Sequence, residues 1–423
     1  MNSEKVIVKH NTRGKYITGI KEFANHNIRQ YGMIFALVVI MVFFGVMTEG
    51  KIIWPRNVSM LLRQNAYVLI LAIGMMFCIL TGGNVDLSVG SLVALVSAMS
   101  GLMATTIGLP AWLSIIISII TGLLAGVWQG FWIAYVKVPP FITTLAGMLV
   151  FRGLDNIILN GKTLPLSGLY ITIGTGSVPD IAPNTVPDFL HIGDLLQLQN
   201  KPEFLNVTML AAGLALSIIY VLITIFNRKS KKIRGYEVAT LKSVITKVIL
   251  FFVIINVFSY WLAMDEGMPI MLILLAALYA IYTFIATKTI LGRHIYAMGG
   301  NVKAAELSGI NTKKMMFLVY SNMGLLAGIA AVVTAGRMMA ASPNVGANFE
   351  LDAIGACFIG GASAYGGIGT IWGAVIGAFI MGVMNNGMSI MGLNVFLQSV
   401  AKGLVVLLAV AFDMYSKSKS RLS

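Results

Sequence analysis

Charged side chains are scarce in this sequence. Asp, Glu, Lys and Arg account for 11% of its 423 residues, whereas 57% are hydrophobic. A soluble domain has about 25% charged residues, so the composition excludes that class. The hydrophobic runs are continuous over about 20 residues, as spanning helices require, whereas barrel strands alternate over about 10 residues. The predicted fold is therefore an all-α bundle of a polytopic membrane protein.

The residues that build metal and disulfide sites are also few. The only two cysteines, Cys78 and Cys357, lie inside hydrophobic runs, so we expect buried core residues and no disulfide. The four histidines are scattered along the chain, and no metal site is predicted. No Gly-Lys-Ser/Thr triplet follows the glycine-rich stretches, so the chain has no phosphate loop for ATP.

The net charge of +14 raises the question of nucleic-acid binding. The basic residues lie in the gaps between hydrophobic runs, as the positive-inside bias of membrane proteins predicts, so we reject that function. Residues 1–30 and 413–423 are expected to be cytoplasmic tails, and residues 31–412 the transmembrane domain. Within it, residues 227–247 contain seven basic groups and are expected inside, while the proline-rich stretch 161–206 is expected outside.

Counting hydrophobic runs gives about twelve crossings (10–12), with both termini inside. The first crossing is expected at Tyr31–Thr48. Residues 337–352 are expected to be an outer loop. The uncharged stretch 353–393 is interrupted by glycines and is expected to form an inward run, a glycine-rich turn and an outward run.

Residues 288–314 separate two hydrophobic runs, and residues 291–314 within them form a polar island. It contains five ionised side chains and a short helical pattern at residues 302–308, between Gly300 and Gly309. A linker needs no such order. We therefore expect a cytoplasmic surface on which another protein acts.

Asp86 is the notable charge within a hydrophobic region, in the stretch TGGNVDLSVG. Broken helices with glycines mark binding regions in transporters, which would place Asn84, Asp86 and Ser88 on a solute pathway. The structural alternative is that the Asp86 carboxylate caps the helix that follows.

A second broken region, FIGGASAYGGIGT at residues 358–370, resembles the first in its placement and in its Gly-Gly pair. Gly360 and Gly361 are therefore candidate pathway residues, and the two regions could form an internal repeat. The alternative is close helix crossing, which small residues permit.

Three further charges fall within or beside the predicted spans. Arg152 and Asp155 are i, i+3 neighbours, which favours an ion pair, although a proton relay is the alternative. Lys402 has no obvious partner, because Glu350 and Asp352 are expected too far toward the outside.

Several stretches together resemble the permeases of monosaccharide ABC importers in the ribose/xylose group. The resemblance covers nearly the whole chain, and the longer xylose members are similar in having a two-span insertion, here residues 207–264. The stretches that carry it are LLRQNAYVLILAIGM (61–75), DLSVGS (86–91), VPPFITTLAGM (138–148), LGRHIYAMGGNVKAAELSGIN (291–311), ELDAIGACFIGGASAYGGIGT (350–370) and NNGMS (385–389).

The resemblance implies a permease homodimer in the bacterial cytoplasmic (inner) membrane, which imports a monosaccharide such as xylose. It also implies an ATPase subunit with tandem nucleotide-binding domains and an extracytoplasmic sugar-binding protein. The permease itself would be no enzyme and hold no cofactor, because the partner subunit binds ATP. Residues 303–309 resemble the EAA-x-x-x-G pattern of permeases, with lysine in place of the first glutamate.

That resemblance makes the polar island the ATPase-coupling loop, with Gly292, Arg293, Ala304, Ala305, Glu306 and Gly309 as its expected residues. A rival class is an ion-coupled secondary sugar carrier. Such a carrier uses several intramembrane carboxylates, and here Asp86 and Asp155 are the candidates.

Overall fold

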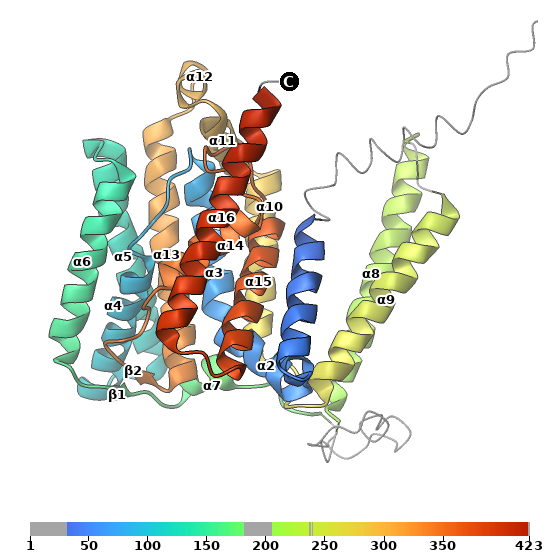
Figure 1. The fold of residues 1–423 in the computed structure, drawn as a ribbon, viewed down its shortest axis with the longest axis horizontal. Helices are drawn as coiled ribbons and strands as arrows, with labels where there is room; N and C mark the ends of the chain where they lie inside the picture. Colours follow the sequence, from blue (N-terminus) through green and yellow to red (C-terminus); the bar gives the residue numbers. More distant parts are fainter. Residues whose placement is uncertain (1–31, 182–204, 237, 239, 422–423) are drawn as a thin grey trace, which may run out of the picture.

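The computed structural model describes residues 32–181, 205–236, 238 and 240–421. The expected N-terminal tail (1–30), residues 182–204 of the expected external loop and residues 422–423 lie outside the described residues. Helices form almost all of the described structure (Figure 1), so the prediction of an all-α membrane bundle is confirmed.

A helix at Gly32–Met47 comes first. The labelled helices that follow are α2 (Pro55–Gln64), α3 (Ala66–Leu80), α4 (Val89–Gly101), α5 (Ala111–Phe131), α6 (Pro140–Leu159), α7 (Leu169–Thr175), α8 (Val207–Ile233), α9 (Leu241–Ala263), α10 (Ile270–Lys288), α11 (Ile290–Gly300), α12 (Val302–Leu307), α13 (Thr312–Met338), α14 (Phe349–Ile359), α15 (Ile371–Ile390) and α16 (Val395–Arg421). Short π-helical turns extend α4 through Thr106 and α5 through Val136.

Within the described residues, eight helices are long and apolar enough to cross a membrane. The pair α2 and α3, bent by 43°, adds a ninth if the two helices are counted as one span, and Gly32–Met47 and Val395–Ala411 are shorter apolar helices. α14 has 11 residues and a length of about 16 Å, which is about half the hydrocarbon core. The expected inward run is therefore a half-length helix.

The long helix α13 lies at the centre and packs against α3, α4, α5 and α7. Its contact with α5 is a crossing of small residues. A Cβ added to Gly126 would lie 2.6 Å from the Tyr320 carbonyl oxygen and 2.8 Å from the Gly324 Cα. Backbones approach this closely only where side chains are missing. All 15 residues of α3 are buried beside α13.

The α11–α12 connector and the C-terminal part of α16 lie at one end of the bundle, which we call the connector end. The helix α7 and the two-residue strands β1 (Leu164–Pro165) and β2 (Ala340–Ala341) lie at the other, the α7 end (Figure 1). The strands pair antiparallel, with Leu164 opposite Ala341.

After β2 the chain turns back into the bundle. The prediction that residues 337–352 form an outer loop is therefore wrong for much of this segment. The reason is a close backbone contact. Gly346 has φ +76°, and a Cβ there would lie 2.0 Å from the Gly90 carbonyl oxygen. Val345 is buried. The N-terminus of α14 therefore lies inside the protein, next to the first turn of α4.

Two further boundaries differ from the sequence prediction. α8 continues to Ile233 and α9 begins at Leu241, so most of the expected basic loop 227–247 is helical. α16 continues to Arg421, through most of the expected tail 413–423. Long basic side chains tolerate the membrane interface and interact favourably with helix C-termini, so a helix does not end where its charges begin.

Candidate functional site

The connector is built from two capped helices. The Thr289 side chain accepts a hydrogen bond from the Gly292 amide at 3.2 Å, which starts α11, and the Asn301 side chain accepts one from the Ala304 amide at 3.0 Å, which starts α12. Such N-caps satisfy amides that the first helical turn leaves free. The expected polar island is therefore an ordered pair of helices.

Two expected coupling residues are packed inward. A Cβ on Gly292 would lie 2.4 Å from the Ala286 carbonyl oxygen, which explains why glycine fits the junction of α10 and α11. Ala305 is 4% exposed and packs with Met298 and Met315. These residues hold the connector against the bundle.

The other expected coupling residues, Arg293, Ala304, Glu306 and Gly309, are exposed. The Glu306 carboxylate accepts a hydrogen bond from the Thr312 hydroxyl at 2.7 Å, which ties α12 to the start of α13. Sequence reasoning did not single out Leu307, which is 86% exposed at the end of α12. An exposed leucine beside Ala304 gives the outer face of α12 an apolar contact point.

Residues 81–88 form the first break, between α3 and α4. Asp86 is fully buried, and its Oδ1 accepts hydrogen bonds from the Ser88 amide at 2.9 Å and the Ser88 hydroxyl at 2.6 Å. The Gln129 amide donates to the same Ser88 hydroxyl at 2.6 Å. The Asp86 carboxylate therefore binds the residue just before α4, but no side chain caps an amide of α4 itself, so the capping alternative is not confirmed. Asn84 is half-buried and donates to Thr81.

The second break, residues 360–370 between α14 and α15, lies directly against the first. A Cβ on Gly83 would lie 1.9 Å from the Ala364 carbonyl oxygen, and the Gly367 amide donates to the Leu80 carbonyl at 3.1 Å. Gly361 lies in the turn that starts this break, and Gly360 packs on α15, where a Cβ would meet the Gly373 carbonyl at 2.1 Å. The structure thus brings the two predicted breaks together.

The connector touches the end of α3, where the first break begins, and also the second break. A Cβ on Gly299, near the end of α11, would lie 1.8 Å from the Leu80 carbonyl oxygen and 2.3 Å from the Gly367 nitrogen. The Tyr296 hydroxyl donates to the Gly369 carbonyl at 2.8 Å. The expected coupling loop and the expected pathway stretches are therefore in direct contact.

A buried polar cluster surrounds Asp352 in the first turn of α14. Its carboxylate lies 2.9 Å from the Lys402 ammonium of α16 and accepts a hydrogen bond from the Tyr67 hydroxyl at 2.6 Å. The Asn385 amide of α15 approaches it at 3.4 Å. The expectation that Asp352 is too distant to pair with Lys402 is therefore wrong, because the chain returns into the bundle before α14.

Arg152 holds the returning segment in place. Its guanidinium donates to the Pro343 and Val345 carbonyls, each at 2.9 Å. It also lies 3.6 Å from the buried Asp155 carboxylate, so the predicted i, i+3 ion pair is confirmed.

Neither a metal site nor a disulfide is present in the described structure. Its residues include no group of three or more metal-ligating acidic, histidine or cysteine side chains. Cys78 and Cys357 are free and buried, as their hydrophobic surroundings predicted.

Comparison with known proteins identifies the family to which this chain belongs. Residues 57–184 and 202–410 match the family described as the permease component of branched-chain amino acid transport systems. The chain belongs to this family. The permease is therefore a transport protein and not an enzyme, and its apolar helices make it a multi-pass protein of the inner membrane.

Curated relatives match the permease over almost its whole length. It is 41% identical to the xylose transport system permease protein XylH of Haemophilus influenzae over 394 residues, which are 93% of this chain and 98% of that protein. It is 38% identical to XylH of Escherichia coli, over 95% of this chain and 96% of that protein. The ribose import permease protein RbsC of Bacillus subtilis is 33% identical, over 91% and 93%. No solved structure matches.

Proposed function

We propose that the permease imports xylose or a closely similar monosaccharide across the cytoplasmic membrane, driven by ATP hydrolysis in a partner subunit. The observation that supports this choice of substrate is the 41% identity to XylH of Haemophilus influenzae along nearly all of both chains. The family description names branched-chain amino acids, which makes these the substrates to test against sugars.

The proposed assembly is a permease homodimer with an ATPase subunit that has tandem nucleotide-binding domains, and an extracytoplasmic sugar-binding protein. The connector end faces the cytoplasm in this proposal. Basic residues at this end support that orientation. The last two turns of α8 contain Arg228, Lys229, Lys231 and Lys232, and Lys303 of α12 is followed by Lys313 and Lys314 in the first turn of α13. The α7 end then faces the binding protein.

Coupling proceeds through the connector in this proposal. The ATPase docks on the exposed face of α12, around Ala304 and Leu307, and its movement displaces α11. Gly299 contacts the end of α3, next to the first break, and Gly299 and Tyr296 both contact the second break. For this reason α11 cannot shift without moving these segments or losing the contacts. ATP-dependent switching then needs differential contacts in two states.

The breaks are the parts of the membrane domain that we propose to line or gate the pathway. Asn84, Asp86, Ser88, Gly360 and Gly361 all lie on them. In the conformation described here Asp86 and Ser88 are fully buried, so this state is closed around them. Discontinuous helices that end inside a membrane recur at transporter sites because the freed backbone groups meet protein or solute there.

Uptake by cells lacking the chromosomal gene tests the proposal. Plasmid-borne permease should restore uptake of labelled xylose, and unlabelled xylose should compete better than ribose, while leucine should not compete. Depleting ATP should stop uptake even when the proton gradient is maintained. Uptake that follows the gradient alone would support the rival ion-coupled carrier. Restored leucine uptake without sugar uptake would contradict the proposal that the substrate is a sugar.

A further inference from the structure

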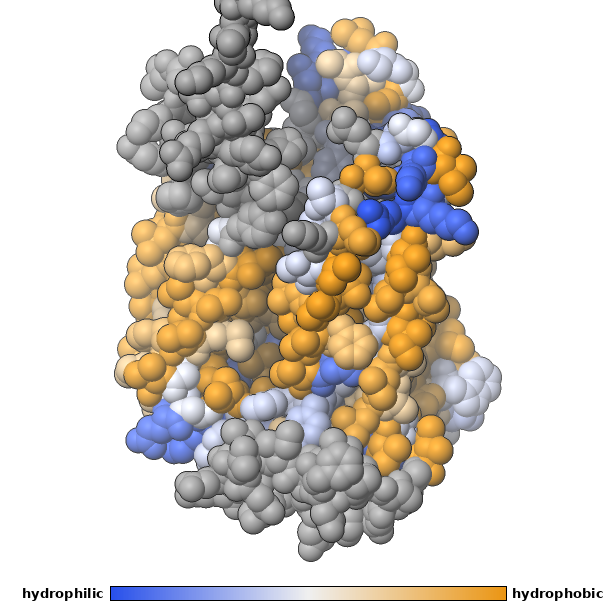
Figure 2. Space-filling model, turned by 90° about the vertical axis from the view of Figure 1, so that its right-hand side faces the viewer, coloured by the Kyte–Doolittle hydropathy of each residue, from blue (hydrophilic) through white to orange (hydrophobic). Residues whose placement is uncertain are grey.

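The helices α8 and α9 form a hairpin that stands at the side of the bundle (Figure 1). A small cluster that includes Leu62, Met209 and Leu262 attaches it at the α7 end. Figure 2 shows this flank: apolar side chains cover its middle, and hydrophilic side chains gather above them at the connector end.

A groove of about 460 Å³ lies between the two helices at their connector end. One face of α8 and one face of α9 line it, as their i, i+3 and i+4 spacing requires. The lining residues are Val221, Ile225, Arg228, Lys229, Lys232, Leu241, Val244, Ile245 and Val248. The groove is therefore apolar along its length and basic at one end.

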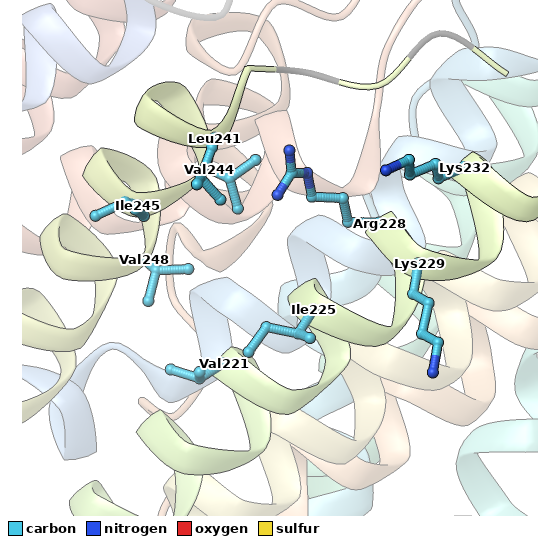
Figure 3. Close-up of a pocket in the computed structure, with 9 residues that line it drawn as sticks. All are labelled: Val221, Ile225, Arg228, Lys229, Lys232, Leu241, Val244, Ile245 and Val248. Atoms are coloured by element: carbon cyan, nitrogen blue, oxygen red, sulfur yellow. The ribbon is translucent and has the colours of Figure 1, made fainter.

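Arg228 is the notable residue of this groove. Its side chain reaches across the space between the helices toward Leu241 and Val244 (Figure 3). Its Nε is buried and has no hydrogen-bond partner among the described residues. A buried donor without an acceptor is unfavourable, so the geometry indicates that an acceptor from outside the described chain belongs here.

The depth of Arg228 matches a membrane interface. At a rise of about 1.5 Å per residue, Arg228 lies about 32 Å along α8 from Val207, just beyond a hydrocarbon core of about 30 Å. Val221 lies about 10 Å deeper than Arg228, within the core. The basic end of the groove is thus level with lipid phosphates, and its apolar part is level with acyl chains.

We propose that this groove binds an anionic phospholipid of the leaflet at the connector end. The lipid phosphate accepts hydrogen bonds from Arg228 and forms an ion pair with Lys232. One acyl chain of the lipid lies along Val221, Ile225 and Val248. Charge complementarity selects the lipid: basic groups facing this leaflet attract anionic headgroups, and guanidinium suits phosphate geometry. Positive-inside bias alone would explain the charges but not an unpartnered arginine above an apolar groove.

The test is native mass spectrometry of the purified full-length permease in detergent, titrated with phosphatidylglycerol or phosphatidylethanolamine. We expect a saturable phosphatidylglycerol adduct that is tighter than any phosphatidylethanolamine adduct. Each basic group near the membrane surface contributes about a fivefold increase in affinity for an anionic lipid. The variant Arg228→Ala/Lys232→Ala, which lacks two of them, should therefore bind phosphatidylglycerol about 25-fold more weakly. The matched control Lys231→Ala/Arg234→Ala removes the same charges from residues that line a different pocket of α8 and should bind as the original does.

Two further measurements distinguish a bound phospholipid from a bound soluble phosphate. The variant Val248→Trp keeps every charge but fills the apolar part of the groove, so it should also weaken the adduct. Soluble glycerol 3-phosphate should not compete. Equal binding of both lipids, equal losses in the two double variants, or full competition by glycerol 3-phosphate would each overturn the proposal. Thermal unfolding of each variant identifies any that has misfolded, and the Val248→Trp and double-variant results are compared only among folded proteins.

Discussion

The ion pair between Lys402 and Asp352 gives a sharp test of the returning segment. Asp352 is 1% exposed, and Lys402 reaches it from a neighbouring helix at 2.9 Å. Replacing Lys402 by methionine leaves the carboxylate buried, with the Tyr67 hydroxyl and the Asn385 amide as its remaining partners. Removing one partner of a buried pair costs about 3–5 kcal/mol. We therefore expect Lys402→Met to lower the free energy of unfolding by about that amount.

The double variant isolates the pair itself. Asp352→Asn keeps an acceptor for Tyr67 but removes the charge, so Asp352→Asn/Lys402→Met places neither a lone carboxylate nor a lone ammonium in the interior. Replacing both members of a buried pair is often close to neutral. We expect the double variant to regain most of the loss, with a coupling energy of about 2 kcal/mol or more.

The assay is denaturant unfolding of the detergent-solubilised permease, with xylose uptake measured in parallel. Lys288→Met is the matched control, because Lys288 is exposed in the last turn of α10, and it should change stability by less than about 0.5 kcal/mol. Additive effects of the two single substitutions, with a coupling energy below about 0.5 kcal/mol, would refute the reasoning.

Three other predictions follow from the contacts described. Gly299→Val should reduce xylose uptake strongly, because its Cβ would lie 1.8 Å from the Leu80 oxygen; Gly300→Val, with nothing within 4 Å, is the control, and equal uptake in both would count against transmission through α11. Leu307→Ser should leave thermal unfolding unchanged but reduce ATPase co-purification and uptake, and normal co-purification would exclude this contact. Arg152→Met should speed proteolysis within residues 342–348, since two hydrogen bonds to that segment are lost; an unchanged cleavage rate would show that other contacts suffice.

Much of the fold could be predicted because membrane helices are determined locally. A hydrophobic run must satisfy its own backbone hydrogen bonds, so the runs that contain α3, α5 and α13 each predicted a helix. The Gly-Gly pairs likewise predicted both breaks. The helical pattern at residues 302–308, between Gly300 and Gly309, is also local, which is why the polar island could be expected to be ordered.

The position of Asp352 could not be predicted, because it depends on a contact between distant parts of the chain. Residues 342–348 (SPNVGAN) have the composition of an exposed loop. Their return into the bundle requires Gly346 to lie against Gly90 and Arg152 to bind two carbonyl groups. Tyr67 and Asn385 were missed for the same reason, although both lie in stretches that carry the family resemblance. No local periodicity relates them to Asp352.

The contacts among α11 and the two breaks differ in kind from ordinary side-chain packing. At Gly83 and Gly299, a hypothetical Cβ would lie closest to main-chain atoms of the neighbouring segment. A flexible side chain absorbs a small displacement by changing its rotamer, whereas two backbones in contact have no such freedom, and packed interiors transmit strain. A shift of α11 therefore either moves both breaks together or separates them from α11. Either outcome changes the environment of α4 and α14, because Gly346, three residues before α14, packs against Gly90 of α4. These contacts therefore make both helices sensitive to force on the connector.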